Sequence, residues 1–268
     1  MLLFWPCSWG LTLAYDFSTQ LNNYFFYLIL FFLGSVLMRS AGCIVNDILD
    51  KEFDKKVFRT KDRPIASNQI SIKLGIFYVI ILCFLALLVL LNFNSFTIFL
   101  ALGSMPLAFT YPLMKRFTYW PQLFLGITFN YGLILGWTAI KGQIDFVPII
   151  FYLGAIFWTL GYDTIYGYQD IKDDEIIGLK STSIKFKSNP HKFLIICYSV
   201  FLLNLLITGL FMELNNFYYL VFMVIFLQIF YYQLKKLDIK NNIKCLTIFK
   251  SNNILGFLVF FGLIIGKI

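Results

Sequence analysis

The chain has 268 residues, of which 59% are hydrophobic, 20% are aromatic and only 13% are charged. A soluble domain carries roughly twice that charged fraction, so the composition excludes an ordinary soluble protein and indicates an integral membrane protein. The formal net charge is +8 at pH 7, and the basic residues lie in loops between apolar segments. We therefore expect the lipid bilayer as a partner, and neither nucleic acid nor an obligate protein partner.

Nine apolar segments are predicted to form helices, because most approach the ~20 residues that cross a bilayer and none alternates as a strand does. The segment at 2–15 is too short to span comfortably. A signal peptide is its other interpretation, but no basic region precedes it, and we interpret it as a first transmembrane helix that lacks its beginning. The others lie at about 23–45, 72–92, 94–113, 120–140, 146–166, 192–212, 215–233 and 249–266. The prediction is an all-α polytopic membrane protein, a single domain over residues 1–268.

The loops that follow the even-numbered helices hold nearly all of the basic residues, whereas the opposite loops share a single lysine, Lys141. Since lysine and arginine mark the cytoplasmic side of a membrane protein, the even-to-odd loops are predicted to be cytoplasmic. Arg39 is an exception, because it lies within a span. An intramembrane arginine marks a functional interior by default, although its side chain could also extend to the cytoplasmic edge.

The first polar stretch follows the second helix and reads NDILDKEFDKKVFRTKDRPIAS at 46–67. Asn46, Asp50 and Asp54 are spaced by four residues, so on a helix they share one face. Asp47 belongs to the adjoining face, and a basic tail with Arg59 follows. A solvated loop would explain such a stretch if it stood alone.

The second polar stretch follows the sixth helix and reads GYDTIYGYQDIKDDEIIGLKST at 161–182. Asp170 and Asp174 are again four residues apart and share a helix face. Asp163 lies two turns upstream of Asp170, and Lys180 follows with two hydroxyl residues. Because both stretches follow even-numbered helices, they open on the same membrane face, which argues against two unrelated loops.

Two facing groups of carboxylates suit the chemistry of a diphosphate. Mg²⁺ takes its oxygen ligands from one or two carboxylates, water and substrate phosphate, and with nearby lysine or arginine it neutralises the charge that grows on pyrophosphate as a C–O bond breaks. An allylic diphosphate ionises readily, and a pocket within the bilayer would exclude water from its carbocation. The cysteines stand singly and His191 is the only histidine, which argues against a zinc site or a Ser/His/Asp triad.

These stretches resemble the signatures NDxxDxxxD and YDTxYxxxDxxDD of the UbiA superfamily of intramembrane aromatic prenyltransferases. Similar wording occurs in MRSAGCIVND at 38–47, RTKDRPIAS at 59–67, YPLMKRFTYWPQ at 111–122 and GLKST at 178–182. The resemblance covers nearly the whole chain and implies nine helices around a central cavity, capped on the cytoplasmic side by the Asp motifs. Family members usually carry an Arg-bearing segment before LLxWPCxWG, with which this chain starts, so any cationic contribution from the first helix is not expected here.

The resemblance also implies a role for each candidate residue. Mg²⁺ would be coordinated by Asn46, Asp50, Asp54, Asp170 and Asp174, with Asp47 in support. Pyrophosphate would be bound by Arg59, Arg63, Lys115, Arg116 and Lys180. Arg116 is also a candidate for the carboxylate of the acceptor, and Asp163 and Tyr166 are expected near the reacting carbons; these three are the candidate catalytic residues.

Within the superfamily, the sequences of these segments are most similar to those of members that act on 4-hydroxybenzoate. This implies transfer of a polyprenyl group from polyprenyl diphosphate to the ring carbon ortho to the hydroxyl, with release of pyrophosphate, as in ubiquinone biosynthesis. A sister prenyltransferase for homogentisate, dihydroxynaphthoate or haem is the nearer alternative. A transporter is the more distant one, because intramembrane carboxylates also mark transport paths. The abundance of Phe, Ile, Asn and Lys indicates an AT-rich bacterial genome and hence a bacterial inner membrane, with a mitochondrial membrane as the alternative.

Overall fold

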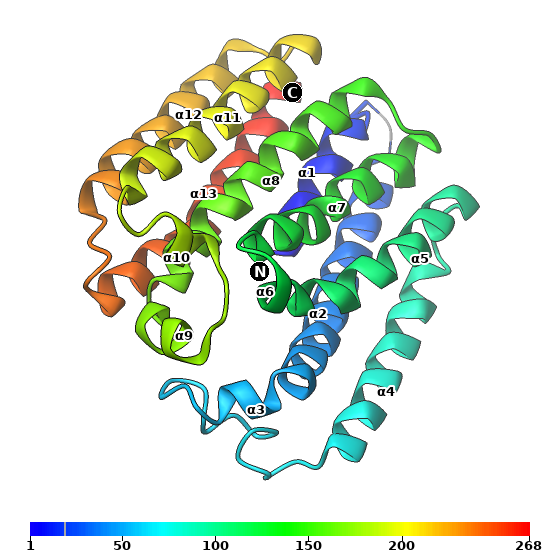
Figure 1. The fold of residues 1–268 in the computed structure, drawn as a ribbon. Helices are drawn as coiled ribbons and strands as arrows, with labels where there is room; N and C mark the ends of the chain where they lie inside the picture. The colour runs from blue at the N-terminus through cyan, green and yellow to red at the C-terminus, as the bar shows by residue number, and fades with distance from the viewer. Residues whose placement is uncertain (19) are drawn as a thin grey trace.

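The computed structural model describes residues 1–18 and 20–268, and all regular secondary structure in these residues is helical. The helices are α1 (Phe4–Ala14), α2 (Leu21–Leu49), α3 (Lys51–Asp54), α4 (Ile72–Leu90), α5 (Ser95–Thr110), η1 (Tyr111–Leu113), α6 (Met114–Phe117), α7 (Pro121–Lys141), α8 (Phe146–Gly167), α9 (Ile171–Ile177), α10 (Thr182–Lys185), α11 (Pro190–Phe211), α12 (Asn216–Leu227), the π-helical η2 (Gln228–Leu234) and α13 (Asn242–Lys267). Figure 1 shows α4 and α5 at one edge of the bundle, α11 and α12 at the opposite edge, and α1, α7 and α8 between them.

Eight helical segments within the described residues are long and apolar enough to cross a membrane. They are α2, α4, α5 with η1 and α6, α7, α8, α11, α12 with η2, and α13. All eight fall where the sequence predicts spans. The ninth predicted span is a helix as expected, but α1 has 11 residues, about 16 Å at 1.5 Å per residue, and is too short to cross the hydrocarbon core.

The short helix α1 lies in the middle of the bundle, where its residues from Trp5 to Ala14 are all buried. It packs most extensively on α7, and also on α13 and α2. Small residues make the α1–α7 contact close: a methyl group added to Gly136 would lie 2.6 Å from the Leu11 nitrogen. This is the packing of transmembrane helices through small residues spaced four apart, since Gly132 and Gly136 lie on one face of α7.

The helix α13 also packs on α1. The Trp9 indole donates a hydrogen bond of 3.0 Å to the Gly256 carbonyl. At the other end of α1, the Lys267 ammonium donates to the carbonyls of Thr12 at 3.2 Å and Leu13 at 2.7 Å, and to that of Tyr15. A cation at a helix C-terminus satisfies carbonyls that have no partner within the helix.

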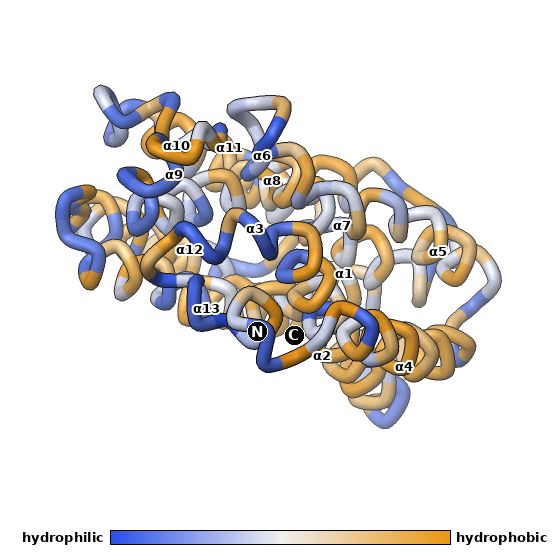
Figure 2. The backbone as a smooth tube through the Cα atoms, turned by 60° about the horizontal axis from the view of Figure 1, so that its bottom comes forward, coloured by the Kyte–Doolittle hydropathy of each residue, from blue (hydrophilic) through white to orange (hydrophobic). Residues whose placement is uncertain are grey.

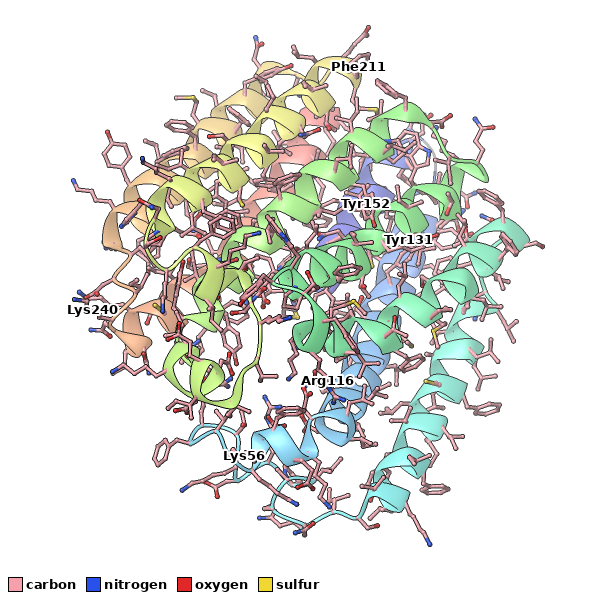
Figure 3. The ribbon with its side chains drawn as sticks, in the orientation of Figure 1. Lys56, Arg116, Tyr131, Tyr152, Phe211 and Lys240 are labelled. Atoms are coloured by element: carbon pink, nitrogen blue, oxygen red, sulfur yellow. The ribbon has the colours of Figure 1, made fainter. Side chains whose placement is uncertain are left out.

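Apolar side chains on the outer helices remain exposed, because the bilayer replaces protein as their environment. The helix α4 packs chiefly on α2, and large hydrophobic residues along it, such as Phe77 and Phe84, are more than half exposed. Figure 2 shows α4 as hydrophobic along nearly its whole length, whereas the segments around α3 and α9 are hydrophilic. In Figure 3, Lys56 and Lys240 lie toward the end of the bundle that carries α3 and α9, and Phe211 lies at the other end.

Candidate functional site

The two acidic stretches line one cavity of about 520 Å³ at the end of the bundle that carries α3 and α9. The prediction that they face each other is therefore confirmed. The predicted site residues that line this cavity are Asn46, Asp47, Asp50, Asp54, Arg59, Arg63, Lys115, Asp163, Tyr166, Asp170, Asp174 and Lys180. Among the described residues, Arg116 is the predicted site residue that does not line it.

A helical spacing of four residues aligns the carboxylates, although the helix that carries them is interrupted. The helix α2 ends at Leu49, Asp50 leaves the helical conformation (φ −98°, ψ 3°), and α3 begins at the next residue. Even so, the backbone hydrogen bonds continue from the Asp50 nitrogen to the Asn46 carbonyl at 2.9 Å and from the Asp54 nitrogen to the Asp50 carbonyl at 2.8 Å. The shared face expected from the sequence is thus preserved across the break.

The second stretch has the same construction. Asp170 precedes α9, and the Asp174 nitrogen donates to its carbonyl at 2.9 Å. Gly178 ends α9 with φ 79°, a left-handed conformation that favours glycine. The turn lets the Leu179 nitrogen donate to the Asp174 carbonyl at 2.9 Å, and the Lys180 nitrogen then donates to the Lys115 carbonyl at 2.9 Å. This backbone hydrogen bond joins the second polar stretch to α6.

Four of the five predicted pyrophosphate-binding cations form ion pairs with predicted metal ligands. The Arg59 guanidinium grips Asp170 with two hydrogen bonds, one of them 2.7 Å from Nε to Oδ1. Arg63 Nη1 lies between Asp47 Oδ1 at 2.9 Å and Asp54 Oδ2 at 3.0 Å. The Arg59 contact joins the two polar stretches, which the sequence alone shows as separate motifs, whereas the Arg63 contacts lie within the first stretch.

Lys115 pairs with Asp50 through its ammonium group. Lys180 lines the cavity and donates a hydrogen bond of 3.3 Å to the Phe117 carbonyl. Arg116 lies behind Asp50, where its Nη2 donates to the Leu49 carbonyl at 2.6 Å and lies 3.8 Å from Asp50 Oδ1. Arg116 therefore caps the end of α2.

Burial raises the pKa of two carboxylates of this site, Asp50 and Asp174. Asp50 is 1% exposed, and burial raises its pKa even though the Lys115 ammonium opposes that rise. Burial, together with the neighbouring charge of Asp170, raises the pKa of Asp174 to about 6. Conversely, the hydrogen bonds from Arg59 to Asp170 raise the pKa of that guanidinium.

The donor atoms present suit a hard divalent cation. They are carboxylate and amide oxygens, the ligands that Mg²⁺ prefers, and Asp50 Oδ1 is buried without a hydrogen-bond partner. Within residues 1–18 and 20–268, however, the structure has no group of three or more His, Cys, Asp or Glu side chains already gathered as a metal centre. The residue types are those that bind Mg²⁺, but several of the carboxylates form ion pairs with lysine or arginine side chains.

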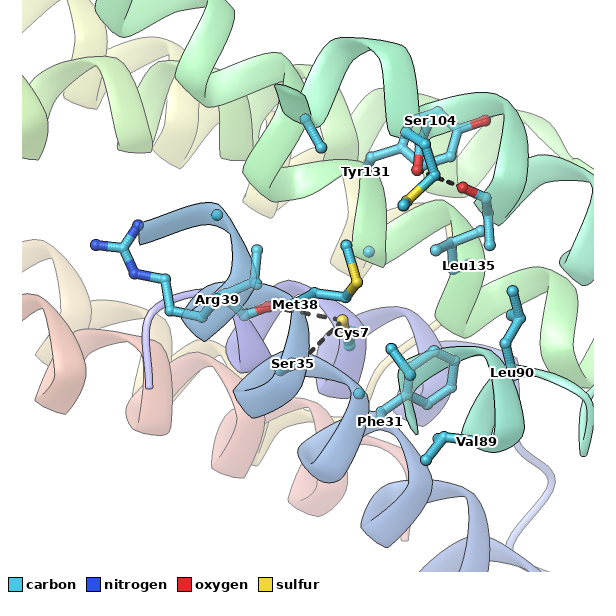
Figure 4. Close-up of a pocket in the computed structure, with 18 of the residues that line it drawn as sticks. Cys7, Phe31, Ser35, Met38, Arg39, Val89, Leu90, Ser104, Tyr131 and Leu135 are labelled. Carbon is cyan, nitrogen blue, oxygen red and sulfur yellow. Dashed lines mark hydrogen bonds between the residues drawn. The ribbon is translucent and has the colours of Figure 1, made fainter. Parts of the chain in front are cut away.

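A second cavity of about 220 Å³ continues from the first toward the middle of the bundle, between α2, α4, α5 and α7. Its walls are mainly apolar, and Leu3, Arg39, Tyr111 and Phe129 line both cavities. Figure 4 shows Arg39 at one end of this group of side chains and Tyr131 across from α2. The family resemblance implies a central cavity, but the sequence does not identify the residues that line this one, because they show no motif.

Arg39 is the functional candidate to which sequence reasoning assigned no role. Its guanidinium lies over the Phe129 ring, 5.2 Å from the centroid. It lies within electrostatic reach of Asp163, yet no carboxylate oxygen in the described part of the chain comes within ion-pair distance of it. The signal in the sequence was its position inside a span.

Comparisons with known proteins agree with this architecture. A profile of the UbiA prenyltransferase family matches residues 3–261. The chain is 43% identical over 269 residues to 4-hydroxybenzoate polyprenyltransferase, mitochondrial, of Bos taurus, an alignment covering 100% of this chain and 71% of the bovine protein.

Solved structures show a similar fold. A UbiA homologue from Aeropyrum pernix K1 in its apo form has a TM-score of 0.78 at 20% identity, covering 100% of this chain and 98% of that one. A UbiA homologue from Archaeoglobus fulgidus, bound to DMAPP and Mg²⁺, has a TM-score of 0.71 at 16% identity, covering 98% and 94%.

Proposed function

The chain belongs to the UbiA prenyltransferase family, and from this premise we propose that it transfers a polyprenyl group from polyprenyl diphosphate to 4-hydroxybenzoate. The C–O bond to pyrophosphate breaks, a C–C bond forms at the ring carbon ortho to the hydroxyl, and the ring proton at that carbon is lost. The observation that carries this proposal is the continuity of a charged cavity with an apolar one. The name of the bovine relative supports the choice of acceptor.

Mg²⁺ is the proposed cofactor, held by Asn46, Asp50 and Asp54 of one stretch and by Asp170 and Asp174 of the other, with Asp47 in support. All of these residues line the charged cavity. The UbiA homologue from Archaeoglobus fulgidus is bound to the same ion together with DMAPP, which supports the proposal. When bound, Mg²⁺ would neutralise charge that develops on the leaving pyrophosphate.

The diphosphate is proposed to lie against Arg59, Arg63, Lys115 and Lys180, whose side chains reach the cavity from three different segments. The prenyl tail then extends into the apolar cavity, where burial of its methylene groups stabilises it and water is excluded from the allylic cation. Tyr166 and Phe249, whose ring centroids are 4.5 Å apart, add aromatic faces to the lining of the charged cavity. Such faces attract a cation.

The carboxylate of the acceptor is proposed to bind Arg39 instead of Arg116. Arg39 lines both cavities and forms no ion pair with any residue that the structure describes, whereas Arg116 donates a hydrogen bond to the Leu49 carbonyl at the end of α2. Arg116 then supports Asp50 and the diphosphate from behind. Asp163 lines the same cavity near Arg39, and we propose that it accepts the ring proton after the C–C bond forms.

The chain is a multi-pass membrane protein. We propose that residues 1–268 act as one domain, without an obligate protein partner, in a bacterial inner membrane with the charged cavity toward the cytoplasm. The curated relatives are mitochondrial, so membrane fractionation would decide between the two membranes. Reporter fusions in the segment after α3 and in the loop between α11 and α12 would test the orientation.

A membrane assay with radiolabelled 4-hydroxybenzoate, a polyprenyl diphosphate and Mg²⁺ tests the reaction. We expect label to enter the organic phase, with equimolar pyrophosphate released, and both signals to vanish with EDTA. Asp174→Asn is the matched control, because it keeps the side-chain shape and removes one proposed ligand. Homogentisate and dihydroxynaphthoate are the competing acceptors; preferential labelling of either would refute the assignment of 4-hydroxybenzoate.

A further inference from the structure

The strongest unexplained feature of the site is that its cations hold its carboxylates. Arg59 is bonded to Asp170, and Arg63 to both Asp47 and Asp54. Lys115 is bonded to Asp50 in the same way. Each of these cations is proposed to bind the diphosphate, and each carboxylate is proposed to bind or support the metal. The two sets of groups that would bind the metal and the diphosphate therefore neutralise each other.

The consequence for a metal ion alone is unfavourable. A divalent cation entering the cavity would have to displace an arginine or a lysine from a carboxylate, and the released cation would stay close to the metal. Like charges at such distances repel, and the repulsion is strong where water is scarce. A diphosphate removes this penalty, because its oxygens accept the released guanidinium and ammonium groups.

From these pairs we infer that metal binding depends on diphosphate, through an exchange in which Arg59 and Arg63 leave their carboxylates for phosphate oxygens. The inference rests on the proposed function and adds the order of events at its site. Metal-free protein is held in a self-neutralised state, and the metal and the diphosphate enter together.

The Arg59–Asp170 pair also joins two segments that line the charged cavity. Arg59 lies in the segment between α3 and α4, and Asp170 lies 111 residues away at the start of α9. Beside this pair, the Phe58 nitrogen donates to Asp173 Oδ2 at 3.2 Å, and Arg59 Nη1 donates to the Tyr166 hydroxyl at 2.9 Å. Release of Arg59 from Asp170 therefore also loosens the link between the two segments.

The test measures binding without turnover, with the full chain in lipid nanodiscs. Mn²⁺ alone is titrated and its free concentration followed by electron paramagnetic resonance. In a separate arm, radiolabelled inorganic pyrophosphate is bound at saturating Mg²⁺ in equilibrium dialysis. We expect Arg59→Gln and Arg63→Gln to bind Mn²⁺ alone about tenfold more tightly than the unmodified chain, the effect of one charge-assisted hydrogen bond. Both variants should bind pyrophosphate about tenfold more weakly.

Lys187→Gln is the matched control, because Lys187 forms an ion pair with Glu175 on the same membrane face and lies outside the lining of the charged cavity. It removes the same charge without freeing a metal ligand, and it should leave both affinities unchanged. Unaltered or weaker Mn²⁺ binding in both arginine variants would overturn the inference, as would equal tightening in Lys187→Gln. Arg63 pairs with different carboxylates from Arg59, so each variant tests the exchange by itself.

Neither arm contains the aromatic acceptor. A failed prenylation assay would refute the proposed function, whereas opposite changes in metal and pyrophosphate affinity would still support the exchange.

Discussion

Replacement of Arg39 by methionine tests the proposed acceptor site most directly. Methionine keeps much of the side-chain length and apolar character and removes the charge that faces the cavities. A carboxylate bound by two charge-assisted hydrogen bonds, at about 1.5 kcal/mol each, gains about 3 kcal/mol from this arginine. At 1.4 kcal/mol per factor of ten, kcat/KM for 4-hydroxybenzoate should fall about 100-fold.

The assay compares the unmodified enzyme and Arg39→Met, each with two acceptors, 4-hydroxybenzoate and phenol. Phenol lacks the carboxylate, so the difference in intrinsic reactivity between the two acceptors is the same in both enzymes and cancels. In Arg39→Met, kcat/KM for phenol should be nearly unchanged while that for 4-hydroxybenzoate falls. Arg39→Lys keeps the charge but loses the planar fork, and we expect an intermediate loss.

Two results would refute the reasoning. Equal losses for phenol and 4-hydroxybenzoate would mean that Arg39 does not recognise the carboxylate. A rise in KM for the polyprenyl diphosphate, with the acceptor KM unchanged, would place Arg39 at the diphosphate. The same comparison applied to Arg116→Met tests the alternative that the sequence suggested.

Three other predictions follow from the geometry. Asp50→Asn should lower turnover by about two orders of magnitude, since it removes a buried charge proposed to bind the metal, and retention of wild-type rates at saturating Mg²⁺ would contradict this. Protonation of Asp174 below its pKa of about 6 removes a proposed ligand, so the Mg²⁺ concentration for half-maximal activity should rise as pH falls below 6 and not above 7; a requirement that is flat from pH 5 to 7 would count against it. Gly136→Ala should destabilise the protein by about 1–3 kcal/mol through the clash with Leu11, seen as a lower Tm in detergent, whereas Gly103→Ala, which meets open space, should leave Tm unchanged or slightly higher.

Much of this fold is predictable from the sequence, because the bilayer demands long apolar segments and the helices supply them. The predicted spans at 23–45 and 249–266 both lie within observed helices, α2 and α13, which run several residues further. Helix ends are less predictable, since α2 continues through the polar residues Asn46 and Asp47 and ends at Leu49. The composition indicates where the apolar, membrane-spanning part of a helix ends, but the helix itself continues beyond that point.

The candidate site is predictable in its acidic half and less so in its basic half. A spacing of four residues places Asn46, Asp50 and Asp54 on one face even across the break after α2. The partners of the cations depend on contacts between segments that are distant in sequence, such as Arg59 with Asp170. Arg39 illustrates the remaining limit: its position within a span indicates a role, but the role depends on which cavities it lines.

The contacts of α1 with α13 bear on how the protein is assembled. Three polar groups of α1 are synthesised about 250 residues before their hydrogen-bond partners. The Trp9 indole awaits the Gly256 carbonyl, and the carbonyls of Thr12 and Leu13 await Lys267. Until α13 inserts, these buried polar groups of α1 lack those partners in a medium that has no water to offer. Leu3 of the same segment lines both cavities. The two cavities are therefore completed only after the helix carrying Lys267 has entered the bilayer.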